Sequence, residues 1–131
     1  MNITHVQVLS VPVSDQNRAR DFYVDTLGLQ LVADTPMGPD QRWVQVAPAG
    51  AATSITLVTW FDQMPAGSLS GLVLQTRDID GDCDRLRAAG VELQGPQDAP
   101  WGRHAILRDP DGNGLVLAAE VRVPAEAAVQ Q

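Results

Sequence analysis

The sequence predicts an α+β protein made of two copies of one strand-helix-strand-strand-strand module. Strand and helix signals follow the same order twice, Gly28 and Gly90 end the two helices, and a Met-Pro-Ala-Gly-Ser segment at residues 64–68 separates the copies. Matching elements recur about 60 residues apart, which is typical of a repeated structural unit. Each helix should cover one side of a curled sheet whose other side is concave, so that the mixed sheet surrounds a cavity.

The first module is predicted over residues 1–62. Alternating β-branched residues favour a first strand at residues 3–11. Ser14 or Asp15 can cap the helix that follows, and Gly28 ends it. Three apolar-rich stretches between Pro/Gly turns predict further strands. They lie at residues 29–33, 42–47 and 54–60.

A linker at residues 63–69 leads to the second module, which is predicted over residues 70–122. Asp78 can cap its helix, along which Ile79, Cys83 and Leu86 form one apolar stripe. The strands of this module are expected at residues 72–76, 91–93, 101–108 and 114–120. Residues 1–122 thus form one domain, followed by a flexible C-terminal tail at residues 123–131.

Composition excludes several classes of protein. With 131 residues, 44% hydrophobic and 19% charged, the chain has the make-up of one globular domain. It has no membrane-spanning apolar stretch and no secretion leader, so we expect a cytoplasmic protein that binds no membrane. The net charge of −7 opposes nucleic-acid binding. Cys83 is the single cysteine, and its place on the apolar stripe indicates a small buried side chain.

Two charged segments are interpreted structurally. The run Asp109-Pro110-Asp111-Gly112-Asn113 lacks the repeated carboxylates of a calcium loop, and its residues are those of a tight turn. The first helix carries an exposed charged face on which opposite charges stand three to five residues apart. Its members are Arg18, Arg20, Asp21 and Asp25.

Three segments together resemble the vicinal oxygen chelate superfamily, which includes glyoxalase I, extradiol dioxygenases, fosfomycin resistance enzymes and bleomycin-binding resistance proteins. They are His5-Val6 at the first strand, Arg-Ala-Arg-Asp-Phe-Tyr-Val-Asp-Thr-Leu-Gly at residues 18–28, and the turn at residues 109–113. The resemblance extends to Glu120 and implies paired βαβββ modules, a homodimer and, in the enzymes of the family, a divalent metal in the cavity.

The family's metal ligands come from the first and last strands of each module. The matching positions here are His5, Thr56, Gly71 and Val116, and His5 is the one usual ligand among them. One imidazole cannot hold a metal against water. We therefore expect neither a metal nor another cofactor. The alternative is a metal-dependent lyase, isomerase or dioxygenase that uses His5 with non-standard ligands such as Gln75 or His104.

Eight residues are the candidates for ligand contact. Tryptophan side chains provide stacking surfaces, although they also fill cores and dimer interfaces. Trp60 is expected on the cavity side with Thr56 and Val58. Gln7 and Gln75 hold matching places in the two modules, and His104 faces either the cavity or the solvent. The full set is His5, Gln7, Trp43, Thr56, Trp60, Gln75, Trp101 and His104.

The leading functional hypothesis is a small-molecule binding protein, similar to the drug-sequestering resistance proteins, that holds a drug or a metabolite. The net charge favours neutral or cationic organic ligands over anionic ones. If the protein is an enzyme, a glyoxalase-like lyase or a dioxygenase is expected. A third hypothesis is metal-free catalysis with His5 or His104 as the general base.

Overall fold

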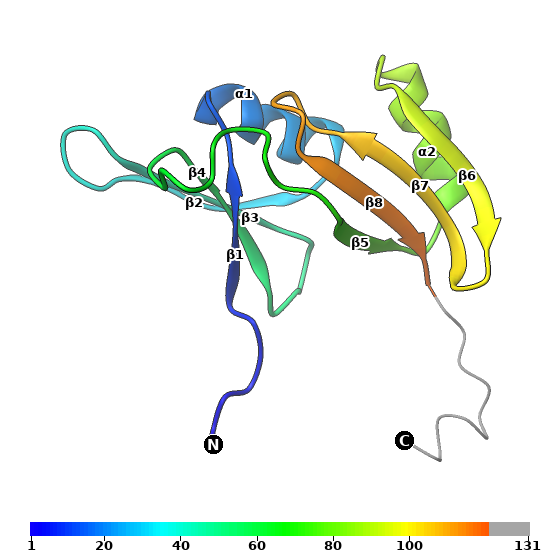
Figure 1. Ribbon diagram of the computed structural model, residues 1–131, viewed down its shortest axis with the longest axis horizontal. Coiled ribbons are helices and arrows are strands. Elements are labelled where there is room, and N and C mark those ends of the chain that lie inside the picture. The colour runs from blue at the N-terminus through cyan, green and yellow to red at the C-terminus, as the bar shows by residue number, and fades with distance from the viewer. Residues whose placement is uncertain (121–131) are drawn as a thin grey trace. The chain divides into compact units, whose positions relative to one another are not determined.

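The two predicted modules are present in the computed structural model, which describes residues 1–120 (Figure 1). The first contains β1 (Val8–Pro12), α1 (Gln16–Asp21), η1 (Phe22–Thr26), β2 (Gln30–Pro36), β3 (Arg42–Ala47) and β4 (Ser54–Val58). The second contains β5 (Leu72–Thr76), α2 (Ile79–Ala88), β6 (Leu93–Ala99), β7 (Gly102–Arg108) and β8 (Gly114–Ala119). The strand orders, β1-β4-β3-β2 and β5-β8-β7-β6, are equivalent. The α+β fold is therefore confirmed, while the tail expected at residues 123–131 lies outside the described residues.

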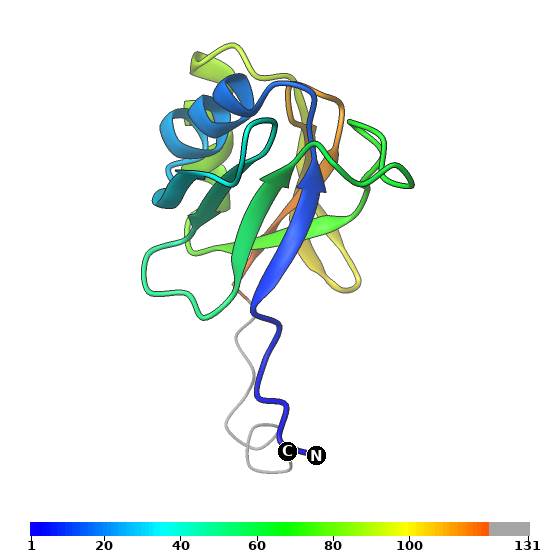
Figure 2. The ribbon, with the colours of Figure 1, turned by 90° about the vertical axis from the view of Figure 1, so that its left-hand side faces the viewer.

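The first strand is shorter than the sequence predicts. β1 pairs in parallel with β4, side by side in Figure 2, and the ladder begins with Val8 opposite Ser54. The prediction of a strand over residues 3–7 was wrong, because a strand needs a partner and β4 starts at Ser54. Ile3 and Val6 are accordingly 81% and 62% exposed.

Local signals set the first helix as predicted. The Asp15 side chain caps α1 by accepting hydrogen bonds from the backbone N–H groups of Asn17 and Arg18. The chain continues through the π-helical turn η1 and reaches Gly28, whose φ of 76° is one that glycine adopts without strain.

One face of the first sheet packs beneath α1. Val11, Val44, Val46 and Leu57 point to this side and are fully buried. At its margin Asp34 of β2 accepts hydrogen bonds from Arg42 (2.6 and 2.7 Å) and from Arg20 of α1 (3.0 Å). The bonds from Arg42, followed by that from Arg20, lower the pKa of Asp34 to about 2. Because Asp34 contacts Arg20 of α1, the side of β2 that carries Asp34 faces the helix.

The second helix follows its predicted stripe. Asp78 accepts a hydrogen bond from the Gly81 N–H, and Ile79, Cys83 and Leu86 are buried. Burial raises the pKa of the Cys83 thiol, which keeps it protonated at neutral pH. Among residues 1–120, no helix is long and apolar enough to cross a membrane.

β6 differs most from its prediction, which placed a strand at residues 91–93. The strand runs over Leu93–Ala99 and pairs with β7 in antiparallel fashion. Gly95 and Pro96, a dipeptide that normally indicates a turn, fall within a shift of register between Gln94 and Gln97. The irregularity lets the strand continue past the proline, which periodicity alone does not reveal.

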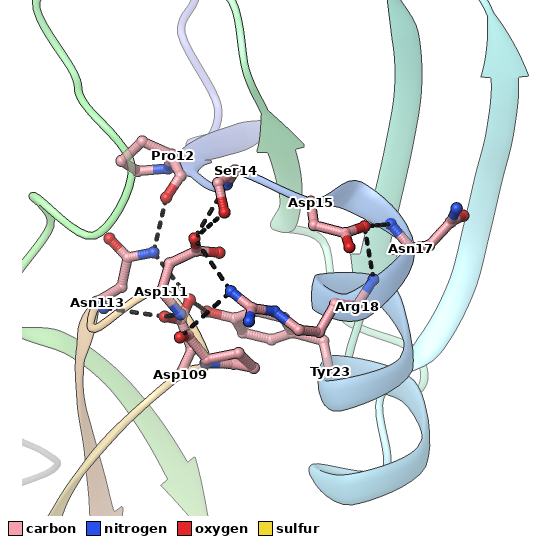
Figure 3. A network of polar contacts seen from close by, with 10 residues as sticks. Pro12, Ser14, Asp15, Asn17, Arg18, Tyr23, Asp109, Asp111 and Asn113 are labelled. Carbon is pink, nitrogen blue, oxygen red and sulfur yellow. Dashed lines mark hydrogen bonds and ion pairs between the residues drawn. The ribbon is translucent and has the colours of Figure 1, made fainter.

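The turn between β7 and β8 holds a buried carboxylate, Asp109 (Figure 3). Its Oδ2 accepts hydrogen bonds from the Tyr23 hydroxyl and from Asn113 Nδ2, both at 2.8 Å. Its Oδ1 accepts from the backbone N–H groups of Asp111 and Asn113, at 3.0 and 2.9 Å. The turn is thus confirmed, and it is also a polar centre of the protein.

Further bonds join this turn to distant parts of the chain. Asn113 Nδ2 also donates to the carbonyl of Pro12 at 2.8 Å, and its Oδ1 accepts from the Leu69 N–H at 3.0 Å. Asp111 Oδ1 accepts from both the N–H and the hydroxyl of Ser14 (Figure 3). The turn therefore fixes the end of β1 and the start of the helix, which in turn positions the sheet.

Candidate functional site

The side of the first sheet opposite α1 is the best-formed candidate surface, and we call it the first helix-free face. Register identifies it, since side chains opposite one another across strands share a face. Ser10 pairs with Thr56, Thr56 with Gln45, and Gln45 with Ala33, forming one row across all four strands. Trp43 shares this face because it lies two residues before Gln45.

No side chain on the first helix-free face carries a formal charge. Its members are Val8, Ser10, Pro12, Gln30, Ala33, Thr35, Trp43, Gln45, Ala47, Ser54, Thr56 and Val58. The charged pairs of this sheet, such as Asp34 with Arg42, lie toward α1 or at its margin. The half-buried members of the face, which include Ser10, Trp43 and Gln45, therefore offer hydroxyl, aromatic and amide groups with which to bind a molecule.

Two polar contacts order the side chains of this face. The Trp43 indole Nε1–H donates to Gln45 Oε1 at 2.9 Å. The hydroxyls of Ser10 and Thr56 are 3.3 Å apart. Thr56 is buried, whereas Ser10, Trp43 and Gln45 are half-buried. The tryptophan ring is thereby held in one orientation while part of its surface stays accessible.

The other candidates from the first module lie outside these strands. His5 and Gln7 precede β1 and are exposed, and His5 Nδ1 lies 2.8 Å from the Thr4 hydroxyl. Trp60 follows the end of β4, half-buried, with its ring tilted against Phe61 at a centroid distance of 6.1 Å. Of the predicted residues, the structure thus brings Trp43 and Thr56 onto one face.

Sequence reasoning missed Ser10 and Gln45. The signal for Gln45 was available, because a residue two positions from Trp43 in a strand shares its face. Ser10 could be found only through its pairing with Thr56.

A second group of candidates lies at the β6–β7 hairpin. The Trp101 and His104 rings are 4.2 Å apart with a 33° tilt, and Gln97 Nε2 lies 3.2 Å from His104 Nε2. Arg103, the neighbour of His104, contacts Asp80 of α2. Because neighbours in a strand face opposite sides, His104 faces away from α2, which settles its side of the sheet.

Two hydrogen bonds orient the His104 ring. Its Nδ1 lies 3.4 Å from the Gly102 carbonyl, a group that only accepts, so Nδ1 carries the hydrogen. His104 is 6% exposed, whereas the Trp101 ring that covers it is 57% exposed. Trp101 is therefore the accessible member of this group.

Gln75 of β5 is exposed and also faces away from α2. Its neighbour Thr76 faces α2, because the Thr76 hydroxyl donates a hydrogen bond to Asp82 of that helix. Neighbouring residues in a strand face opposite sides, so Gln75 lies on the side away from α2.

The residues at the family's metal positions do not fit a metal. Thr56 offers a hydroxyl that contacts Ser10, Gly71 has no side chain, Val116 is apolar, and His5 is exposed before β1. Within the described part of the chain, no three His, Cys, Asp or Glu side chains group as metal ligands would.

A shallow hollow of about 250 Å³ lies elsewhere, between the start of α2 and the end of β8. Its lining residues are Arg77, Asp78, Ile79, Asp80, Ala119 and Glu120, of which four are charged. None of the eight candidates lines this hollow, and its polar walls do not suit an apolar molecule.

Comparison with known proteins agrees with this fold. The model of the Glyoxalase/Bleomycin resistance protein/Dioxygenase superfamily matches residues 2–117. The solved structure of TnmS3, an antibiotic binding protein from Streptomyces sp. CB03234, has 56% sequence identity and a TM-score of 0.89, covering 92% of this chain and 99% of that chain. A member of the superfamily from Sphaerobacter thermophilus DSM 20745 has 39% identity and a TM-score of 0.84, covering 92% of this chain and 100% of that one.

A curated relative extends the similarity. The uncharacterized protein YetH of Bacillus subtilis (strain 168) is 35% identical over an alignment of 119 residues, and the match covers 88% of this chain and 98% of YetH. The matched region includes Tyr23, Asp109 and Asn113, whose hydrogen bonds hold the fold together. The chain belongs to the Glyoxalase/Bleomycin resistance protein/Dioxygenase superfamily.

Proposed function

We propose that this protein binds a neutral, planar aromatic small molecule, such as an antibiotic or an aromatic metabolite, and sequesters it without chemical change. The observation that carries the proposal is the half-buried Trp43 on a sheet face without formal charge. An indole ring offers a large, rigid surface for stacking. Such a face favours neutral ligands, because nothing on it offsets the cost of removing water from a charge.

The polar groups of the same face can orient the ligand through hydrogen bonds. Binding sites for small organic molecules are mostly apolar, with a few fixed hydrogen-bonding groups that orient the ligand. Ser10 and Gln45, both half-buried, are such groups, and they lie in one row beside Trp43. The similarity to TnmS3, an antibiotic binding protein, supports a ligand of antibiotic type. We also propose a cytoplasmic homodimer, as the family resemblance implies.

Isothermal titration calorimetry against a panel of neutral aromatic antibiotics and metabolites tests the proposal, with tryptophan fluorescence as a second readout. We expect at least one ligand of micromolar or tighter affinity that quenches the emission, and weaker binding of carboxylated analogues. Absence of both heat and quenching across a broad panel would contradict the proposed function.

We further propose that binding needs no metal. Elemental analysis of protein purified without chelator should find less than one divalent metal ion per chain, and a chelator should leave ligand affinity unchanged. A stoichiometric metal that disappears in the His5→Ala variant would instead favour the metal-dependent enzyme.

A further inference from the structure

The orientation of the Gln45 side-chain amide is fixed by its contact with Trp43. An indole N–H only donates, so the atom that it meets at 2.9 Å must be the amide oxygen. The amide nitrogen, Nε2, then occupies the other branch of the planar group. Its two N–H donors take no part in the Trp43 contact.

Those donors are open to an incoming molecule. Within residues 1–120, Asp111 Oδ2 is the one side-chain N or O atom that is fully buried without a partner. Gln45 Nε2 has no hydrogen-bond partner among these residues either, so it keeps access to water. Its cross-strand neighbour Ala33 is too small to cover it, and the hydroxyl of its other neighbour, Thr56, already contacts Ser10.

We propose that Gln45 is a specificity-determining residue that selects aromatic ligands bearing a ring carbonyl. The inference rests on the proposed function and adds the ligand group that the site recognises. A planar molecule stacked on Trp43 would place its edge near Gln45, because residues two apart in a strand are neighbours on one face. A ring carbonyl accepts from Nε2, whereas a hydrocarbon buries these donors unpaired, which disfavours its binding.

Fluorenone and fluorene form a suitable probe pair, since both are neutral, planar and nearly equal in size, and only fluorenone has a carbonyl. Equilibrium dialysis, with each compound quantified by chromatography, gives the two dissociation constants. We expect the intact protein to bind fluorenone about tenfold more tightly than fluorene, the difference that one ligand hydrogen bond supplies.

Two substitutions remove the donors in different ways. Gln45→Glu keeps an oxygen that accepts from Trp43 and replaces the amide nitrogen by a carboxylate oxygen. Gln45→Met keeps the length of the side chain without either group. Both should abolish the preference for fluorenone. In Gln45→Met fluorene should bind at least as tightly as it binds the intact protein, because no donor is then buried unpaired. Gln41→Glu adds the same charge at an exposed position before β3 and should retain the preference.

The outcomes separate this inference from the proposed function. Equal affinities of the intact protein for the two compounds, or a preference that survives in a folded Gln45→Met variant, would overturn the role of Gln45 while aromatic binding stands. If neither compound binds the intact protein although panel ligands do, the carbonyl selection is also wrong. Failure of every aromatic compound would remove the proposed function and this inference together. Circular dichroism confirms that each variant is folded.

Discussion

Replacing Asp109 by alanine should lower the free energy of unfolding by about 3–5 kcal/mol, the largest stability effect that we expect from a single side chain. Four hydrogen-bond donors converge on this carboxylate, two from side chains and two from the backbone. Domains of ordinary size have a total stability of about 5–15 kcal/mol. The variant should therefore be marginally stable at best.

The physical reason is the burial of the donors that remain. Tyr23 and Asn113 are fully buried, so their O–H and N–H groups would find no water in place of the carboxylate. Burial, followed by the neighbouring charge of Asp109, raises the pKa of Tyr23, so the hydroxyl keeps its proton at any ordinary pH. The Tyr23 hydroxyl therefore cannot lose its proton to avoid being an unpaired buried donor.

Chemical denaturation followed by circular dichroism measures the effect. Tyr23→Phe removes one donor and should cost about 1–2 kcal/mol, since the carboxylate keeps its other partners. Asp62→Ala, an exposed acid in the loop after β4, provides the matched control and should change stability by less than about 0.5 kcal/mol. A cost below 1 kcal/mol for Asp109→Ala would show that the network is not a centre of stability.

The largest effect on binding is expected from Trp43→Ala, which should weaken the affinity for fluorenone about 30-fold or more. A central aromatic contact typically contributes at least about 2 kcal/mol to binding, and a factor of ten corresponds to about 1.4 kcal/mol. The substitution removes the stacking surface and also removes the one side-chain hydrogen bond that Gln45 makes among the described residues. Stacking and orientation are therefore lost together.

Parallel substitutions of the other tryptophans make this test specific. Trp60 was the sequence-based choice for ligand contact, but it lies beyond the end of β4 and its ring is tilted against Phe61. We expect Trp60→Ala to weaken fluorenone binding less than threefold, about 0.6 kcal/mol. If Trp60→Ala lost more fluorenone affinity than Trp43→Ala, the ligand would bind at the loop after β4, as the sequence-based prediction for Trp60 implies. Equilibrium dialysis provides the affinities.

The parts of the fold that the sequence predicted correctly depend on neighbouring residues. The Asp15 and Asp78 side chains cap their helices by accepting from backbone N–H groups only a few positions away, and Gly28 follows the helical turn that it ends. The buried stripe of α2 repeats with the helical period. Each of these features can be predicted from residues that lie within the same turn or the same helix.

The parts that failed or were missed depend on distant partners. β1 starts at Val8 because its partner starts at Ser54, and alternation in residues 3–7 cannot show this. Asp109 was interpreted only as a turn residue, since Tyr23 is 86 positions away in the sequence. Ser10 belongs to the candidate site through its pairing with Thr56, which is 46 positions away in the sequence. Pairing between strands is decided by the whole sheet, beyond the reach of a local pattern.

The most direct test of ligand binding on the first helix-free face is the nuclear magnetic resonance signal of the three tryptophan indole N–H groups during a fluorenone titration. The Trp43 signal, assigned by its absence in Trp43→Phe, should shift most, because its ring stacks on the ligand and its Nε1–H bonds to Gln45. The Trp60 and Trp101 signals should shift less. Saturable binding that leaves the Trp43 signal unmoved would contradict a ligand site on this face.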